Sequence, residues 1–264
     1  MNTWRRVLVV AGWSGLGLVA VAVMLSEFLA RWPAGSERVG PPLLAPSAPF
    51  PFGTDLLGRD VLSETIYGMS LSATQAAEAA LIALVAGALM GFIGARLPRY
   101  LAALLHWAVA SFAAIPPLLL ALLLVALSSR GLCAVAAGLA AAPLAFLRTF
   151  ERARRESLAG HAAHARATGI SGSALLNRDL TYEFRDALLP TIARALAAVA
   201  IILSTLSFLG FGDTPPHRDL GLMIAAARSS YFTAWWTAAF PALALMLLIL
   251  LARLAAGLDE GERP

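Results

Sequence analysis

The stretch "TQAAEAALIALVAGALMGFIGA", residues 74–95, decides the class of fold to which this chain belongs. It is almost wholly apolar and about as long as the ~20 residues that an α-helix needs to cross the hydrocarbon core of a bilayer. Gly87 and Gly91 form a G-x-x-x-G pattern, which lets two membrane helices approach closely. We therefore expect a transmembrane helix at residues 73–95 that packs against a neighbour through its glycines.

The composition of the whole chain also indicates a protein that is surrounded by a lipid bilayer. The 264 residues are 59% hydrophobic and 14% charged, with a mean hydropathy of +0.75, which is too apolar for the wetted surface of a soluble domain. All 20 basic residues are arginine, so a phosphate-binding GxxxxGK[ST] loop is excluded. The formal charge of +4 is explained by membrane loops, and we expect lipid contact and no nucleic acid.

Apolar runs of spanning length predict an all-α polytopic membrane protein with six transmembrane helices. The six runs lie at 7–29, 73–95, 101–127, 132–147, 189–211 and 235–257. The predicted organisation is an N-terminal segment and first helix at 1–30, an external loop at 31–70, and a transmembrane domain at 71–264 with a cytoplasmic loop at 148–188. The first run also resembles the start of a secretory signal peptide, but its length favours a retained anchor.

The arginines predict the orientation. With six spans both termini share a compartment, and 14 of the 20 arginines fall on that side. Because cytoplasmic loops are enriched in positive charge, we expect cytoplasmic N- and C-termini.

Three residues inside the predicted spans are candidates for a translocation path. Glu78 is the acidic residue deepest in a predicted span, where a carboxylate needs a partner, water or a proton. The alternative is that the span begins later and that Glu78 lies at the outer interface. Pro116 and Pro117 each remove a backbone donor and bend their helix, which permits either rearrangement or a fixed kink.

The histidines raise the question of a metal site. His161 and His164 lie one helical turn apart in "AGHAAHARATGI", residues 159–170, but no Cys, Asp or Glu follows at ligand spacing. Cys133 stands alone in an apolar run, which favours a packing role. No G-x-S-x-G or HExxH motif is present, so we expect no catalytic residues, no metal and no cofactor, and a protein that is not itself an enzyme.

Three further stretches carry a resemblance to a known family. "PFGTDLLGRDVLSETIYG" precedes an apolar span, "LSFLGFGDTPP" ends another, and "WWTAAFPALALMLL" begins the last. In this order they resemble the inner-membrane permease subunits of ABC importers for dipeptides, oligopeptides and nickel, of the type that contains GTDxxGRD. The resemblance implies the type I ABC importer permease fold in a bacterial inner membrane, and transport of small peptides or related polar solutes, metal chelates such as nickel complexes or metallophores included.

The external motif consists of Gly53, Thr54, Asp55, Gly58, Arg59 and Asp60. The two glycines allow tight turns, and the two aspartates are suited to capping short helices. The motif is interpreted either as a structured lid or docking edge, or as an anchor for the chain entering the second span.

The resemblance also assigns a coupling helix to the cytoplasmic loop, which fits a groove on an ATPase subunit. Its E-A-A-x-x-x-G motif aligns with Ala163, His164, Ala165, Arg166 and Gly169, so that the glutamate is absent. Glu64 and Ser70 also replace arginines that are common in the family, and Ala110 replaces an aspartate.

The partners implied by the resemblance are a homologous second permease subunit, two ATP-binding subunits and an extracytoplasmic solute-binding protein, with ATP bound by those partners. The alternative function is a proton-coupled secondary transporter or channel subunit in which Glu78 titrates. The sequence shows no convincing internal repeat, which weakens the case for a single-chain secondary transporter built from inverted halves.

Overall fold

The computed structural model describes residues 3–36, 38–127, 132–158, 189–212 and 218–257. These ranges are mainly helical, with a long loop between α2 and α3, and they contain no strand, apart from an isolated bridge between Thr54 and Asp60. Five helices are long and apolar enough to cross a membrane, and a bent helix pair makes a sixth if it counts as one span. The predicted fold class, an all-α polytopic membrane protein, is confirmed.

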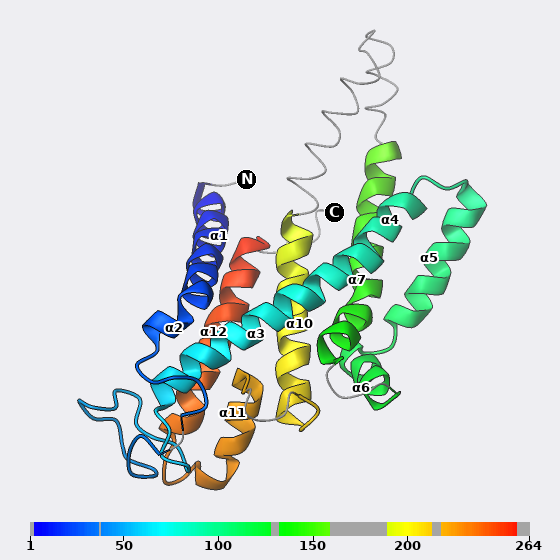
Figure 1. Cartoon of the computed structure of the whole chain (residues 1–264). Coiled ribbons are helices and arrows are strands. Elements are labelled where there is room, and N and C mark those ends of the chain that lie inside the picture. The colour runs from blue at the N-terminus through cyan, green and yellow to red at the C-terminus, as the bar shows by residue number, and fades with distance from the viewer. Residues whose placement is uncertain (1–2, 37, 128–131, 159–188, 213–217, 258–264) are drawn as a thin grey trace.

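Figure 1 shows α1, α12, α10 and α7 running in roughly one direction, with α3 crossing them obliquely and the loop between α2 and α3 gathered at one end of the molecule. In chain order the elements are α1 (Thr3–Met24), α2 (Ser26–Leu29), α3 (Val61–Ala83), the π-helix η1 (Leu84–Ala88), α4 (Leu89–Gly94), α5 (Arg99–Ala113), α6 (Pro117–Leu127), α7 (Cys133–Leu158), α10 (Leu189–Phe208), α11 (Leu220–Ala226), the 3-10 turn η3 (Ala227–Ser230) and α12 (Trp236–Ala255).

The second span begins earlier than the apolar pattern predicts. The expected external loop at 31–70 ends at Asp60, because the side chain of Asp60 accepts the backbone N–H of Ser63 and so starts α3 at Val61. The span from Val61 to Gly94 has 34 residues, about 50 Å at 1.5 Å per residue, which exceeds the hydrocarbon thickness. Glu78 therefore lies near the middle of this helix.

The expected third span at 101–127 is broken. Helices α5 and α6 meet at 82° around Ile115 and Pro116, where the missing N–H of proline ends the helical hydrogen bonding. Pro117 then occupies the first position of α6, where its fixed φ suits a helix start.

The fourth span is longer than the expected 132–147. Helix α7 runs from Cys133 to Leu158 and keeps its course past Pro143. The first residues of the expected cytoplasmic loop at 148–188 thus belong to α7, because Arg152 and Arg154 are good helix formers that need no apolar surroundings.

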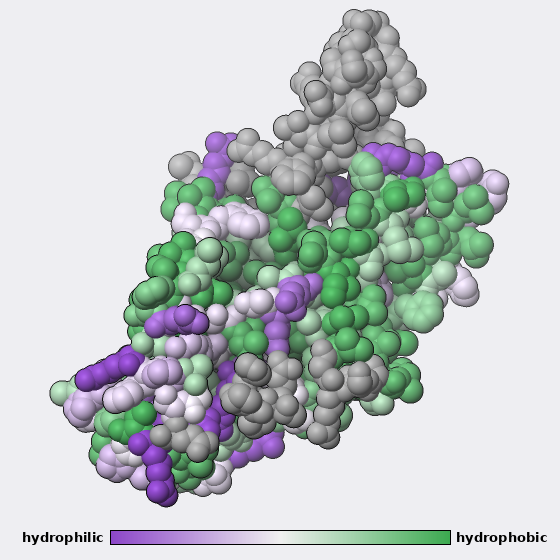
Figure 2. Space-filling view, viewed as in Figure 1, coloured by the Kyte–Doolittle hydropathy of each residue, from purple (hydrophilic) through white to green (hydrophobic). Residues whose placement is uncertain are grey.

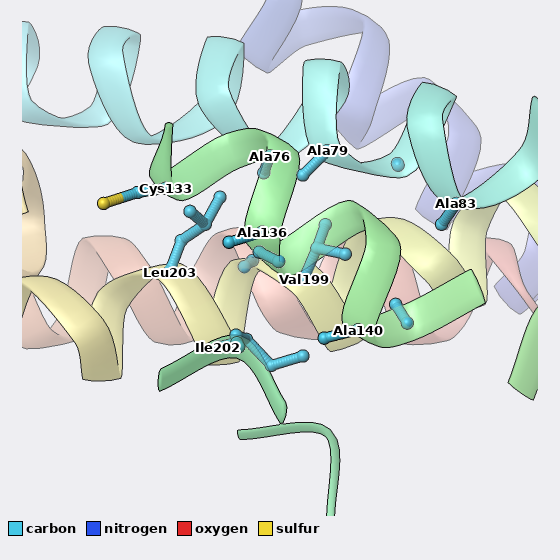
Figure 3. Packing of buried hydrophobic residues seen from close by; sticks show 14 of the residues in the cluster. Ala76, Ala79, Ala83, Cys133, Ala136, Ala140, Val199, Ile202 and Leu203 are labelled. Carbon is cyan, nitrogen blue, oxygen red and sulfur yellow. The ribbon is translucent and has the colours of Figure 1, made fainter. Parts of the chain in front are cut away.

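An alanine-rich core joins α3, α7 and α10. Figure 3 shows side chains from the three helices meeting, with Ala76, Ala79 and Ala83 from α3, Cys133, Ala136 and Ala140 from α7, and Val199, Ile202 and Leu203 from α10. Small side chains allow membrane helices to come close, since dispersion contacts replace the hydrophobic effect in lipid.

The predicted glycine face of the second span packs as expected. A Cβ at Gly87 would collide with the carbonyl of Ala142, and a Cβ at Gly91 would lie 2.5 Å from the carbonyl oxygen of Phe146. The close approach of η1 and α4 to α7 therefore requires glycine at both positions.

The surface matches a protein in a bilayer. Figure 2 shows a broad apolar belt over the helices, whereas hydrophilic residues gather at the end that carries the loop before α3. Helix α1 packs along α12, where a Cβ at Gly12 would collide with the backbone of Ala255, and its other side exposes Val7, Val10 and Leu18.

Candidate functional site

The external motif folds around Asp55. One carboxylate oxygen of Asp55 accepts the N–H groups of Leu57 at 2.8 Å and Arg59 at 2.9 Å, and the carbonyl of Asp55 accepts the N–H of Gly58. This is the local bonding by which aspartate stabilises a tight turn. Gly58 has a φ of +75°, and a Cβ there would collide with the carbonyl oxygen of Gly40. Of the two predicted helix caps, only Asp60 is one; Asp55 holds a turn.

Thr54 is wholly buried and fixes the loop that precedes the motif. Its hydroxyl donates to the carbonyl of Pro41 at 2.5 Å and accepts the N–H of Leu44 at 2.9 Å. A buried hydroxyl with both a donor and an acceptor role satisfied stabilises a single loop conformation. The loop therefore has a fixed shape against the start of α3.

The motif also contacts the last span. The indole Nε1 of Trp236 donates to the carbonyl of Thr54 at 3.2 Å, and the rings of Phe52 and Phe240 stack with centroids 3.8 Å apart. Gly53 has a φ of +71°, and a Cβ there would lie 2.6 Å from Trp236 Nε1. The motifs GTDxxGRD and WWxxxFP thus form one packed unit, with only Leu56 and Leu57 of the first motif exposed.

Four charged side chains lie together beside this unit. Arg218 donates to the second carboxylate oxygen of Asp55 at 3.2 Å, and Arg59 lies 3.9 Å from Glu64. Arg59 and Glu64 have side chains only 8% and 10% exposed, so each charge has its counter-ion close by in a buried setting. Glu64, which departs from the family pattern, therefore faces an arginine of the motif.

A cavity of about 160 Å³ opens next to these charges. Its lining is mainly apolar and includes Leu56, Leu57, Val61 and Met223, with Asp55, Glu64 and Arg218 among the polar members. These apolar and polar residues come from the motif loop, the first turn of α3, α11 and the segment just before α11.

The SFLGFG segment forms a second polar knot, at the end of α10. Ser207 donates to Asp219 at 2.6 Å, and Asp219 caps α11 by accepting the N–H of Leu222 at 2.9 Å. Ser72 of α3 accepts the N–H of Leu220 at 3.0 Å, so three helices meet there. Sequence reasoning missed Asp219, although an aspartate directly before the apolar "LGLM" is a helix-start signal.

Two further contacts close the end of α10. Arg228 donates to the carbonyl of Phe208 at 2.8 Å, and its guanidinium carbon lies 3.9 Å from the centroid of the Phe208 ring. A positive charge at the C-terminal end of α10 interacts favourably with the helix dipole. Cys133, predicted to be a packing residue, is buried, and its thiol bonds to the carbonyl of Phe211 at 2.8 Å.

Glu78 lies on the exposed side of α3. Thr74, one turn before it, is exposed as well, whereas Ala76, Ala79 and Ala80 point into the core. Towards α10, a narrow crevice without room for a water molecule is lined by Ser72, Gln75 and Ser204 together with Ala200, Leu203 and Asp219. Pro116 and Pro117 belong to a different part of the chain, the break between α5 and α6.

At the opposite end of the spans, Arg154 of α7 donates to the carbonyls of Ala95 at 2.8 Å and Leu97 at 3.3 Å, just after α4 ends. His106 lies 3.8 Å from Glu151, and its ring contacts Phe150. No group of three metal-ligating side chains occurs among the residues that the structure describes. His161 and the predicted coupling residues Ala163, His164, Ala165, Arg166 and Gly169 lie outside those residues.

Proteins with similar sequences are permeases of peptide transport systems. The di/tripeptide transport system permease protein DppC of Pseudomonas aeruginosa is 29% identical over 247 residues, which cover 88% of this chain and 81% of that protein. The peptide transport system permease protein SapC of Escherichia coli O6:H1 is 28% identical and covers 99% of this chain and 92% of its own length. The probable D,D-dipeptide transport system permease protein DdpC of Escherichia coli K12 is 27% identical over 87% of this chain and 78% of its own.

No family model matches the chain. The similarity to these relatives nevertheless extends over most of both sequences, and the helices have the length and composition of membrane spans. The chain is a homologue of the permease proteins of bacterial peptide transport systems, the family that its motifs resemble.

Proposed function

We propose that this chain is a permease subunit of an ATP-driven ABC importer, which moves short peptides across the bacterial inner membrane. The proposal rests on one observation: the relatives that align over most of the chain are all permease proteins of peptide or dipeptide transport systems. The spans of the chain and the absence of lysine for a phosphate loop are consistent with a transport subunit whose ATP is hydrolysed elsewhere. Related polar solutes, metal chelates included, are further substrates to test.

The proposal includes partners of defined kinds. A homologous second permease subunit completes the pathway. Of two ATP-binding subunits, one contacts the coupling helix in the cytoplasmic loop of this chain. A solute-binding protein delivers substrate from outside. In this arrangement the termini are cytoplasmic, as the arginine distribution predicts. Closure of the ATP-binding subunits would move the spans between inward and outward openings.

In this proposal the external motif provides a rigid outer rim. Its turns, the cap of α3 and the hydrogen bond to Trp236 join the loop, α3 and α12 into one unit. A binding protein that docks there would meet a surface of fixed shape, so that little conformational entropy is lost on docking.

The test is reconstitution in liposomes with the second permease, the ATP-binding subunits and the binding protein. We expect uptake of a radiolabelled dipeptide that depends on ATP and on every subunit. The chain alone should neither hydrolyse ATP nor accumulate peptide. Peptide accumulation by the chain alone, driven by a proton gradient, would contradict the proposal and support a secondary transporter.

A further inference from the structure

A strip of polar side chains winds along α3 from the outer polar knot towards the middle of the span. Ser72, Gln75 and Glu78 follow one another at a spacing of three residues, so that each lies next to the previous one on the helix surface. Ser204 of α10 lines the same narrow crevice as Ser72 and Gln75. We refer to Ser72, Gln75 and Glu78 as the polar strip.

The polar strip ends at Glu78. Further along the same exposed side of the second span come Leu81, Val85 and Leu89, which are all exposed and apolar. In Figure 2 a small group of hydrophilic residues interrupts the apolar belt where α3 crosses it. The carboxylate is thus the innermost polar group of a path that begins at the outer end of the spans.

Glu78 has no partner in the part of the chain that the structure describes. The residue is exposed and makes no hydrogen bond or ion pair with any residue in the described ranges. It lies near the middle of a 34-residue helix of spanning length. A charged group on such a helix is costly where it faces hydrocarbon, and charged groups in spans are found instead on a water-filled cavity or a protein partner. Gln75, one turn before Glu78 on α3, supplies a neighbouring polar side chain, so the exposed carboxylate is open to a polar or charged group from outside the chain.

We propose that Glu78 binds the positively charged groups of peptides in transit, above all the α-ammonium group, at the inner end of the polar strip. This inference rests on the proposed function. A carboxylate in a site of reduced dielectric attracts an ammonium or guanidinium group strongly, and a free peptide amino group is mainly protonated at neutral pH. A contact of this kind recognises a peptide whatever its side chains are, which suits a transporter of varied short peptides.

The first experiment measures the local charge directly in the assembled complex. In a Cys133→Ser background, Thr74→Cys places a thiol one helical turn from Glu78, at an exposed position. Its rates of reaction with a cationic and an anionic methanethiosulfonate reagent, both added outside, are compared before and after Glu78→Gln. A unit charge about 6 Å away in water changes each rate about threefold, in opposite senses, so the ratio should fall about tenfold.

The second experiment measures selectivity in the reconstituted complex. Uptake of a dipeptide with a free amino terminus should fall about tenfold in Glu78→Gln, since one charged contact is lost, whereas uptake of the N-acetylated dipeptide should stay as it is. Glu27→Gln makes the same change at an exposed position outside the polar strip and should affect neither peptide.

Several outcomes would overturn the proposal. They are failure of both reagents to modify the thiol of the Thr74→Cys variant, a rate ratio that Glu78→Gln leaves unchanged, or loss of complex assembly in Glu78→Gln, which would mean that Glu78 pairs with a cation of another subunit. If the wild-type complex takes up the free dipeptide and Glu78→Gln does so equally well, this proposal fails alone. If the wild-type complex takes up neither peptide, the proposed function fails with it.

Discussion

The indole of Trp236 donates a hydrogen bond to the carbonyl oxygen of Thr54, with 3.2 Å between Nε1 and O, across 182 positions of sequence. Both groups are buried, so the bond joins the external loop to the last span away from water. The neighbouring Trp235 is 58% exposed, whereas Trp236 is 7% exposed. The tandem tryptophans therefore differ in role. Trp236 holds the loop that carries the external motif, whereas the side chain of Trp235 is largely exposed on the surface.

Trp236→Phe should destabilise the protein by about 1–3 kcal/mol, because it leaves the buried carbonyl of Thr54 without its donor. Trp235→Phe, a matched change at an exposed site, should alter stability by less than about 0.5 kcal/mol. Thermal denaturation of the complex in detergent measures both. Equal losses in the two variants would show that ring size, rather than the hydrogen bond, sets the stability.

Gly53→Ala should be more harmful than Gly210→Ala. Both glycines have positive φ, +71° and +90°, so each substitution carries a backbone cost of about 1–2 kcal/mol. Only at Gly53 does the new Cβ also meet atoms, with the carbonyl oxygen of Leu44 at 2.5 Å, since nothing lies within 4 Å at Gly210. The difference in denaturation midpoint between the variants isolates this crowding, and equal midpoints would contradict the packing described for the motif.

The orientation is tested by thiol labelling in the Cys133→Ser background. Leu56→Cys, in the external motif, should react with an impermeant reagent added to intact cells. Tyr100→Cys, an exposed position at the start of α5, should react only after the membrane is opened. The reverse pattern would place the termini outside and overturn the arginine argument.

The proposed coupling helix is tested with substitutions at His161, His164 and Ala165. Ala165→Asp should uncouple ATP hydrolysis from uptake, since a carboxylate on a narrow alanine surface would be buried against the ATP-binding subunit. His161→Ala combined with His164→Ala should have a milder effect, because neither histidine is assigned as a ligand. Substrate-stimulated ATPase activity, with and without a chelator, measures both. Loss of activity in the histidine variant or with chelator, with Ala165→Asp tolerated, would favour a metal site.

The sequence predicts the existence of the spans well, since a run of apolar residues has few other stable environments. It predicts their ends less well. Helix α3 begins at Val61 because Asp60 caps it, although the first turns carry Ser63, Glu64 and Thr65 and lack the apolar signal. Helix α7 continues beyond its apolar part because Arg154 finds acceptors after α4. Such ends depend on hydrogen bonds that a hydropathy pattern does not contain.

The external motif shows the same division. Turns at Gly53 and Gly58 and the cap at Asp60 follow from residue type, because each effect is local. The pairing of Asp55 with Arg218 and the contact of Thr54 with Trp236 join residues more than 160 positions apart. No short-range pattern encodes these contacts, so only the packed helices reveal them.

Helix α7 has a mechanical consequence. It is 26 residues long, about 39 Å at 1.5 Å per residue. One end lies in the alanine core, and the other leads to the loop that we propose to be cytoplasmic. Near that far end, Arg154 binds the carbonyls of Ala95 and Leu97 at the close of the second span. A force applied at Leu158 would therefore be transmitted through these hydrogen bonds, so that α7 and the second span would move together.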